Sequence, residues 1–328
     1  MNAFIEVNRG RFGVEPICRA LEVSDSAYYA RLSGERSARE LKDERLLAVI
    51  RTVHKENYEA YGYRRMWKEL LRRGELVARC RVQRLMAAND IQGAKRRGRP
   101  WRTTTADPDA KRRPDLVGRD FTASKPGELV VADFTYVRCW EGVVFFAFVL
   151  DVFSRMIVGW QLASHMRAEL VVDALQMALG TRKHLGHVEL VHHSDRGSQY
   201  TSDELHAVMA AAGVLASVGS TGDCFDNAMA ESLVDTYKTE LIADRVWKTA
   251  TEVELGTVGW VGWYNNTRLH GELGDIPPVE YERNATLAAA AAATADVRAG
   301  GIEFRSPYGL AALDPAAPTS TLLTVETK

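Results

Sequence analysis

Three acidic residues occupy positions where a folded chain rarely keeps a charge that has neither a ligand nor a partner. Asp133 lies inside the apolar segment LVVADFTYV, and Asp195 ends the apolar segment VELVHHSD. Glu231 lies in the segment FDNAMAESLVDTYKTELI, with 35 residues between it and Asp195. A carboxylate inside an apolar strand is costly unless it is liganded or paired, and the carboxyl ends of strands are where α/β folds bind ligands.

Three carboxylates that meet at one edge of a sheet would suit phosphodiester chemistry. Two metal ions roughly 4 Å apart activate the attacking oxygen and stabilise the leaving one. Mg²⁺ takes few carboxylates and completes its shell with water and phosphate oxygens. We therefore predict that Asp133, Asp195 and Glu231 are catalytic and bind two Mg²⁺ ions, with Mn²⁺ as a substitute. Alone, each residue has an ordinary alternative: a paired structural carboxylate, a turn cap or a solvated helix stripe.

The segment that carries Glu231 predicts a helix with one polar face. The residues that share this face at helical spacing are Asn227, Glu231, Val234, Asp235 and Lys238. Lys238 follows Glu231 by two turns, roughly 10 Å along the axis. We predict that Lys238 and Asn227 contact the DNA backbone beyond the metals. The alternative for Lys238 is a surface pair with Asp235.

The elements that must position these residues occupy the second part of the chain. Strands are predicted over 129–137, 142–153, 156–165, 188–195 and 215–220, and helices over 169–182, 202–213 and 225–242. Three strands in series, followed by alternating helices and strands, indicate a mixed α/β sheet. This order fits a ribonuclease H-like catalytic core, preceded by an all-α helix-turn-helix region.

A last core helix is predicted over 251–264, where Thr251 and Glu254 have capping-box spacing. We expect this helix to be weak, because each of Gly256, Gly259 and Gly262 costs roughly 1 kcal/mol relative to Ala in a helix interior. After residue 282 the chain is rich in alanine and then in proline and threonine. We expect a tail outside the core, with a short helix across 286–293.

The first part of the chain is basic. Residues 1–120 hold 27 Lys and Arg against 17 Asp and Glu, a balance of +10, and the remainder has a balance of −11. Helices are predicted over 14–32 (two short ones), 41–57, 63–73 and 78–89, and the last three suit a DNA-reading helix-turn-helix. Residues 94–119 hold nine Lys and Arg and three prolines, which is typical of a linker that follows phosphates. The predicted DNA-binding residues here are Arg64, Arg65, Arg79, Arg81, Arg84, Lys95, Arg96, Arg97 and Arg99.

Composition excludes several other classes of protein. The hydrophobic fraction of 46% is ordinary for a folded domain, and no stretch is apolar enough to predict a membrane span. The cysteines at 18, 80, 139 and 224 form no C-x-x-C motif, so neither a disulfide framework nor a zinc site is predicted. We expect a reduced cytosolic protein that is not associated with a membrane.

The chain resembles the open-reading-frame-B transposases of the insertion sequence 3 family, which are related to retroviral integrases. The stretches that carry the resemblance, between about residues 12 and 282, are DERLLAVIRTVH, YEAYGYRRMWKEL, ADFTYV, LDVFSR, HHSDRGSQYTS, GDCFDNAMAES, YKTE and YNNTRLHGELGDIPP. The family pattern maps its metal-binding triad onto Asp133, Asp195 and Glu231, and its basic residue seven positions later onto Lys238. The three glycines of the last core helix and the long alanine-rich tail depart from that pattern.

The resemblance implies Mg²⁺-dependent 3′-end cleavage and strand transfer, with terminal inverted repeats and target DNA as substrates. It also implies a bacterial protein associated with the nucleoid, an upstream reading-frame-A product, often fused to this chain, and a homo-oligomer on DNA. The alternatives are a metal-dependent nuclease that does not join ends and an inactive DNA-binding regulator of the element. The expected domains are a helical DNA-binding region (1–93), a basic linker (94–124), the core (125–284) and the tail (285–328).

Several polar residues near these motifs have two interpretations. His192 and His193 precede Asp195, and we expect them to be buried or to contact substrate rather than to bind metal. The group Asn265, Asn266, Arg268 and His270 matches the terminal motif of the family. Polar packing against the core is the favoured interpretation for this group, and DNA contact is the alternative.

Overall fold

The computed structural model describes residues 2–32, 36–95, 115–118, 120–185, 189–195, 197–219 and 228–299. The chain divides into one compact unit, Met1–Glu282, and a second, Arg283–Lys328. The predicted DNA-binding residues Asn227, Arg96, Arg97 and Arg99 lie outside the described residues. No helix within the described ranges is both long and apolar enough to cross a membrane.

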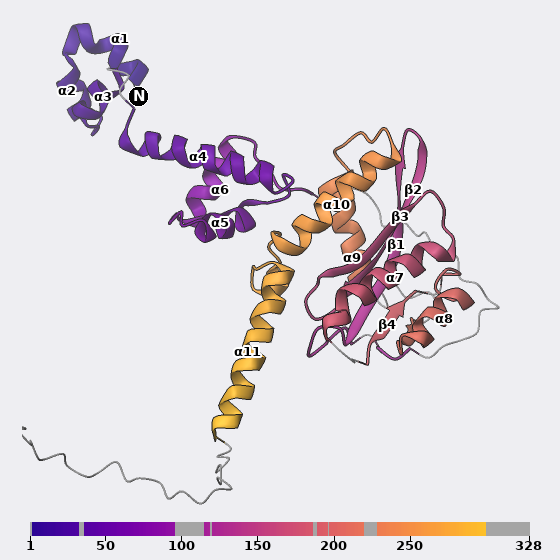
Figure 1. Cartoon of the computed structure of the whole chain (residues 1–328). Coiled ribbons are helices and arrows are strands. Elements are labelled where there is room, and N and C mark those ends of the chain that lie inside the picture. Colours follow the sequence, from indigo (N-terminus) through magenta and orange to yellow (C-terminus); the bar gives the residue numbers. More distant parts are fainter. Residues whose placement is uncertain are drawn as a thin grey trace, which may run out of the picture. The chain divides into compact units, whose positions relative to one another are not determined.

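A five-stranded mixed sheet forms the centre of the first unit (Figure 1). Its strands are β1 (Leu129–Cys139), β2 (Gly142–Asp151), β3 (Ile157–Ala163), β4 (Val191–Ser194) and β5 (Leu215–Val218), in the order β3-β2-β1-β4-β5. The first three strands form an antiparallel meander, whereas β4 and β5 run parallel to β1. The predicted fold class, a mixed α/β core of ribonuclease H-like type behind a helical region, is confirmed.

Helices cover both faces of this sheet. On one face lie α7 (Ala168–Arg182) and α8 (Asp203–Ala211); on the other lie α9 (Ala228–Tyr237) and α10 (Ala250–Asn266). Side chains alternate along a strand, and in β1 Val130 and Ala132 pack in the cluster with α7 and α8. Val131 and Val137 pack in the cluster with α9 and α10. Asp133 lies two residues after Val131, so its side chain points to the same face of the sheet, which α9 and α10 cover.

The N-terminal part of the chain is helical. Its helices are α1 (Asn2–Phe12), α2 (Val14–Ala20), α3 (Asp25–Leu32), α4 (Ala38–Glu56), α5 (Tyr63–Arg72) and α6 (Arg79–Ala88). Sequence patterns did not predict α1, whose single buried residue, Ile5, leaves it little apolar periodicity. Helix α4 begins at a capping box between Ser37 and Glu40, and Gly74 ends α5 with a φ of 82°.

Two predicted helices differ from the structure near the end of the core. Of the helix predicted over 225–242, the structure shows an α-helix over Ala228–Tyr237, which is α9. The residues after it, Lys238–Ile242, form a π-helical turn in which the Ala243 N–H donates to the Lys238 carbonyl. The predicted short helix over 286–293 is part of the longer α11 (Pro278–Ala299). Two 3₁₀ turns, Lys183–Leu185 and Gly271–Leu273, complete the described elements.

The N-cap of α10 lies two residues before the predicted one. Thr249, not Thr251, accepts the hydrogen bond from the Glu252 N–H, and the Glu252 carboxylate accepts one from the Lys248 N–H. A Cβ on Gly256 would lie 2.6 Å from Trp247 Cη2, so this glycine admits the buried Trp247 ring. The glycine that was expected to weaken the helix therefore has a packing function.

Alanine substitutions at two glycines of α10 are expected to have opposite effects on stability. Gly256→Ala forces the Trp247 ring to move, so we expect a loss of about 1–3 kcal/mol despite the better helix propensity of alanine. Gly262→Ala is the matched control, because a Cβ there meets no atom within 4 Å, and we expect a gain of up to about 1 kcal/mol. Urea titrations of the two variants measure this difference, and equal effects would contradict it.

Candidate active site

The register of β1 and β4 brings two of the predicted carboxylates together. The last parallel pair of these strands is Ala132 with Ser194, so Asp133 and Asp195 are the next residues along each strand. Adjacent strands lie about 4.8 Å apart. Paired positions of neighbouring strands point their side chains to the same face of a sheet, so Asp133 and Asp195 share one face. Two predicted site residues that are distant in sequence thus lie side by side where β4 ends.

Glu231 comes to this pair on α9, which packs on β1. The buried side of α9 consists of Ala230, Leu233 and Tyr237, and the Tyr237 ring stacks on Phe146 of β2 with a centroid distance of 4.4 Å. This packing fixes the rotation of α9 and leaves Glu231 at its exposed margin. Glu231 interacts electrostatically with both Asp133 and Asp195.

The carboxylates repel one another. Burial raises the pKa of Asp133 well above its ordinary value, and the charges of Asp195 and Glu231 raise it further. Burial, Asp235 and Asp195 together raise the pKa of Glu231. The Phe134 N–H donates to Asp133 Oδ1 at 2.8 Å, which opposes this shift in part. A site that concentrates negative charge in this way favours a cation.

Asp195 is held by the turn that follows it. The Gly197 N–H donates to Asp195 Oδ1 at 3.0 Å. A Cβ on Gly197 would lie 3.1 Å from the same oxygen, so a larger residue would push against the carboxylate. The turn therefore orients Asp195, and glycine keeps room for it.

Tyr200 is a site residue that sequence reasoning missed. Its side chain is buried, and its hydroxyl has no hydrogen-bond partner among the described residues. Burial raises its pKa, and the charges of Asp133 and Asp195 raise it further, which places Tyr200 beside both carboxylates. The signal was present, since Tyr200 belongs to the segment HHSDRGSQYTS that also holds Asp195.

The donor set fits a hard divalent cation. All three carboxylates are oxygen donors, their mutual repulsion falls when a cation binds, and the Tyr200 hydroxyl is an unpaired polar atom next to them. Within the described ranges, no three His, Cys, Asp or Glu side chains are grouped closely enough to enclose an ion by themselves. Mg²⁺ does not require such a cage, because it binds through one or two carboxylates and keeps water and phosphate oxygens.

The two histidines before Asp195 are buried packing residues. Burial lowers the pKa of His192 to about 4, so this ring is neutral, and it packs against Tyr200 with a centroid distance of 6.2 Å. His193 Nδ1 lies 2.9 Å from Ser217 Oγ of β5. Both rings therefore support β4 from its two faces.

Lys238 follows the last residue of α9 and interacts with a candidate carboxylate. The π-helical turn begins at this residue, and its Nζ lies 5.1 Å from the centroid of the Tyr136 ring. Burial lowers the pKa of Lys238, while Asp235 and Asp133 raise it. Lys238 thus interacts with a site carboxylate as well as with Asp235, and it is half-buried rather than a fully exposed surface cation.

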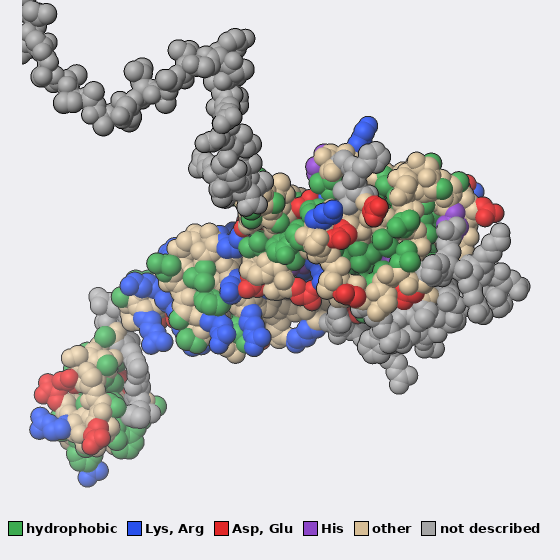
Figure 2. Space-filling view, turned by 90° about the horizontal axis from the view of Figure 1, so that it is seen from below, with side chains coloured by type: hydrophobic (Ala, Val, Ile, Leu, Met, Phe, Trp, Pro, Cys, Tyr) green, Lys and Arg blue, Asp and Glu red, His purple; other side chains and the backbone are tan. Residues whose placement is uncertain are grey.

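The predicted DNA-binding arginines of the helical region have different surroundings. Arg64, Arg79 and Lys95 are exposed, and Figure 2 shows Lys and Arg side chains gathered along the α4–α6 region. Arg81 and Arg84 both bind the Asp43 carboxylate, at 2.7 and 2.6 Å. Arg65, from α5, lies 3.5 Å from Glu240 and is partly buried.

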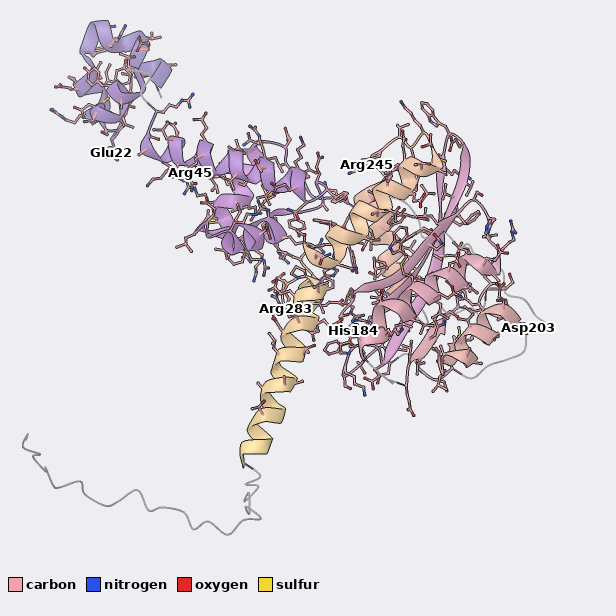
Figure 3. The ribbon with its side chains drawn as sticks, in the orientation of Figure 1. Glu22, Arg45, His184, Asp203, Arg245 and Arg283 are labelled. Atoms are coloured by element: carbon pink, nitrogen blue, oxygen red, sulfur yellow. The ribbon has the colours of Figure 1, made fainter. Side chains whose placement is uncertain are left out.

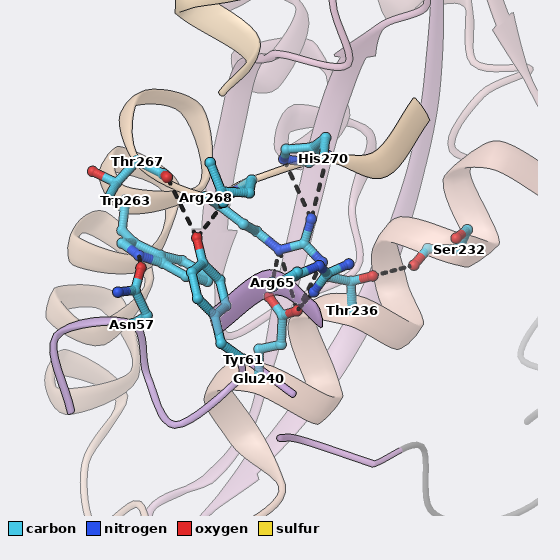
Figure 4. Close-up of polar contacts among 11 residues, drawn as sticks. Asn57, Tyr61, Arg65, Ser232, Thr236, Glu240, Trp263, Thr267, Arg268 and His270 are labelled. Atoms are coloured by element: carbon cyan, nitrogen blue, oxygen red, sulfur yellow. Dashed lines mark hydrogen bonds and ion pairs between the residues drawn. The ribbon is translucent and has the colours of Figure 1, made fainter. Parts of the chain in front are cut away.

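A buried polar network joins the helical region to the end of the core (Figure 4). Arg268 Nε and Nη2 donate to the Glu240 carboxylate at 2.8 and 2.7 Å. Burial, together with the cations Arg268 and Arg65, lowers the pKa of His270 to about 2, so His270 is neutral. Tyr61 accepts a hydrogen bond from the Leu269 N–H at 2.9 Å.

The terminal motif of the core packs as expected. The Asn265 side chain bonds to the Ile157 N–H and carbonyl, both at 2.9 Å, and ties α10 to the start of β3. Trp263 Nε1 donates to Asn57 at 3.0 Å, whereas Asn266 is exposed and bonds to the Gly262 carbonyl. Three of the four residues, Asn265, Arg268 and His270, are buried polar packing residues.

Three family models match the chain. Residues 40–99 match a model described as an HTH-like domain, and residues 123–224 and 212–278 match two models described as integrase core domains. The first covers α4–α6, and the other two cover the sheet and the helices that carry the candidate site.

Several known proteins are similar over most of the chain. The transposase for insertion sequence element IS629 of Shigella sonnei is 46% identical over 288 residues, which cover 86% of this chain and 96% of that protein. The transposase for insertion sequence element IS904 of Lactococcus lactis is 32% identical, with 75% of this chain and 97% of that protein covered. The transposase for insertion sequence element IS3411 of Escherichia coli is 42% identical over 56% of this chain and 78% of that protein.

Proposed function

Because the chain belongs to the insertion sequence 3 family of transposases, we propose that Asp133, Asp195 and Glu231 bind the divalent metal ions of its strand cleavage and strand transfer reactions. The observation that supports this assignment is the β1–β4 register, which makes Asp133 and Asp195 neighbours on the face that α9 covers. The substrates are the terminal inverted repeats of the element and its target DNA.

The metal ions supply activation of the attacking oxygen and stabilisation of the leaving oxygen. Two Mg²⁺ ions fit this role, with Mn²⁺ as a substitute. Asp133, whose pKa both other carboxylates raise, would hold the metal ions together with Asp195 and Glu231. Gly197 keeps Asp195 oriented through its N–H, and the packing of α9 holds Glu231 at the rim of the site.

The helical region would bind DNA ahead of the core. Exposed cations on α5 and α6, together with the basic segment 94–119, are suited to phosphate contacts. We retain the predicted domains: the helical region 1–93, the linker 94–124, the core 125–284 and the tail 285–328. An upstream reading-frame-A product and a homo-oligomer on DNA are further parts of the proposal.

A strand-transfer assay with labelled terminal repeats tests this function. We expect purified chain and Mg²⁺ to produce joined products, with the frame-A product added in a parallel series. Cleaved products without joined ones, in both series, would indicate a nuclease. DNA binding without either product would indicate a regulator of the element.

Lys238 is proposed to contact a phosphate just inside the transferred end. Lys238→Ala should weaken binding and joining of the element ends by about 10- to 100-fold, the range for a hydrogen bond to a charged group. It should not weaken Mg²⁺ binding, because the lysine cation opposes a metal near Asp133. Lys238→Arg should keep substantial activity, since the charge is retained.

The exposed Lys183, at the end of α7, provides the control for Lys238. End-joining rates of Lys183→Ala should equal those of the unmodified protein at low and moderate salt. Unchanged rates for Lys238→Ala would mean that Lys238 only pairs with Asp235, and would remove it from the site.

A further inference from the structure

An exposed tryptophan stands at the tip of the β1–β2 hairpin. Trp140 is 73% exposed and belongs to the two-residue loop between Cys139 and Gly142, the last pair of the two strands. A large aromatic side chain in solvent at a hairpin tip contributes little to the core. Such an exposed ring is a candidate for contact with a ligand.

The backbone under this ring is held in place. The Trp140 N–H donates to the Trp247 carbonyl at 3.1 Å, and the Ala250 N–H donates to the Glu141 carboxylate at 2.8 Å. Trp247 is itself buried against Gly256 of α10. These two hydrogen bonds therefore hold the backbone of the hairpin tip against the segment before α10 and its first residue. The backbone that carries the Trp140 ring is thus fixed in position.

Cations surround the aromatic rings of this surface. Lys248 Nζ lies 5.7 Å from the centroid of the Trp140 ring, and Arg138 Cζ lies 6.0 Å from that of Tyr136. Arg245, in the segment before α10 (Figure 3), lies over the ring of Trp247 at 6.0 Å.

Two carboxylates near the hairpin tip already accept hydrogen bonds from main-chain N–H groups. Glu141 and Glu252 accept hydrogen bonds from the N–H groups of Ala250 and Lys248, at the start of α10. Within the described part of the chain, neither Arg138 nor Lys248 takes part in an ion pair. The surface therefore combines aromatic rings with positive charge, which complements a nucleic acid.

This surface continues into the candidate active site along one edge of β1. β4 pairs with β1 only as far as Ala132, so the strand from Asp133 to Cys139 extends beyond β4 on that side. Lys238 lies over Tyr136, partway along this edge. From Asp133 to Trp140 the strand covers seven steps, roughly 23 Å at about 3.3 Å per residue.

We propose that this edge of β1 binds single-stranded DNA next to the reacting end, with a base stacked on Trp140 and phosphates on Arg138, Lys238 and Lys248. A base face is available for stacking only where the strands have separated, so the surface selects an unpaired segment rather than a duplex. The assignment rests on the proposed function, because the DNA strand bound along this edge would lead to Asp133 of the candidate active site.

The test uses the full chain and a labelled single-stranded oligonucleotide of the terminal repeat, measured by fluorescence anisotropy in EDTA. Trp140→Ala should weaken binding by about 5- to 100-fold, the effect of losing one base–aromatic stack, and Trp140→Phe should restore most of it. Lys248→Gln should lower the slope of log affinity against log salt by about 0.7, whereas Trp140→Ala should leave this slope unchanged.

Leu255→Ala is the matched control, since Leu255 is a 67% exposed apolar residue of α10 outside this surface. Its affinity should equal that of the unmodified chain. Equal affinity of Trp140→Ala would overturn the proposal. Weaker binding accompanied by loss of an oligomer in light scattering would also overturn it, because Trp140 would then contact a second copy. Binding in EDTA is independent of strand transfer, so a failure of the proposed function would be seen separately.

Discussion

Asp133→Asn is expected to abolish cleavage and joining of element ends, by at least about 10³-fold, the scale of loss for a group that acts directly at the reacting centre. Asp133 interacts with both other carboxylates and would bind the metal ions with them, whereas the neutral amide of asparagine would bind these ions poorly. Asp195→Asn and Glu231→Gln should have effects of the same order. DNA binding, measured in EDTA, should change little in all three variants.

The same substitution should stabilise the metal-free protein. The pKa of Asp133 is raised in the folded state, so its contribution to stability is complete below the unfolded pKa of about 3.9. That contribution to stability is lost as the pH rises through the pKa that Asp133 has in the folded protein. Asp133→Asn has no such loss, so above this range the metal-free variant should melt at a higher temperature than the unmodified protein. Added Mg²⁺ should raise the melting temperature of the unmodified protein and not of the variant.

Asp173→Asn is the control for this substitution, because Asp173 is exposed on α7, on the opposite face of the sheet. It should retain full activity and an unchanged response to Mg²⁺. Near-normal strand transfer by any one of the three site variants would remove that residue from the proposed metal centre.

Glu240→Gln is expected to destabilise the fold strongly. The side chains of Glu240 and Arg268 are only 6% and 7% exposed. Burial alone would lower the pKa of Arg268, but Glu240 raises it above its ordinary value. Removing one partner of a buried pair leaves an uncompensated charge and costs roughly 3–5 kcal/mol. Arg65, also a neighbour of Glu240, would then face Arg268 without a counter-charge.

Glu280→Gln provides the matched control in urea unfolding. Glu280 binds Arg72 at 2.6 Å, but these side chains are 26% and 39% exposed, and such pairs contribute about 1 kcal/mol or less. The difference between the two variants should therefore be at least about 2 kcal/mol. Equal losses would show that burial of the Arg268 pair has no special cost.

The strands and most helices of the core could be predicted because their apolar patterns are strong. The segments around Asp133 and Asp195 show where that reasoning succeeds: each is an apolar strand interrupted or ended by one acid. Their side-by-side position could not be predicted with certainty, because it depends on the register of β1 and β4, a pairing between distant segments. The fold supplies the geometry that turns two separate patterns into one site.

Other features depended on contacts that a local pattern does not contain. Tyr200 was missed although its segment also holds Asp195, because the position of its hydroxyl beside two carboxylates depends on the folded structure. The π-helical turn after α9 was also missed, and it contains the buried Glu240, whose partner Arg268 lies 28 residues further along the chain. Gly256 was misjudged since its value depends on Trp247, not on helix propensity.

The parallel pairing of β1 and β4 has a consequence for when this chain becomes able to act on DNA. Parallel strands cannot be joined by a tight turn, and here β2, β3 and α7 intervene between them. A chain that has emerged from the ribosome only as far as the β1–β2–β3 meander holds Asp133 without its neighbours. Because a non-local pairing forms only when the intervening chain closes on itself, Asp133 and Asp195 become neighbours only after the crossover through α7 has closed. A chain that ends before α9 therefore lacks at least one of the three candidate carboxylates, and only a longer chain can complete the candidate site.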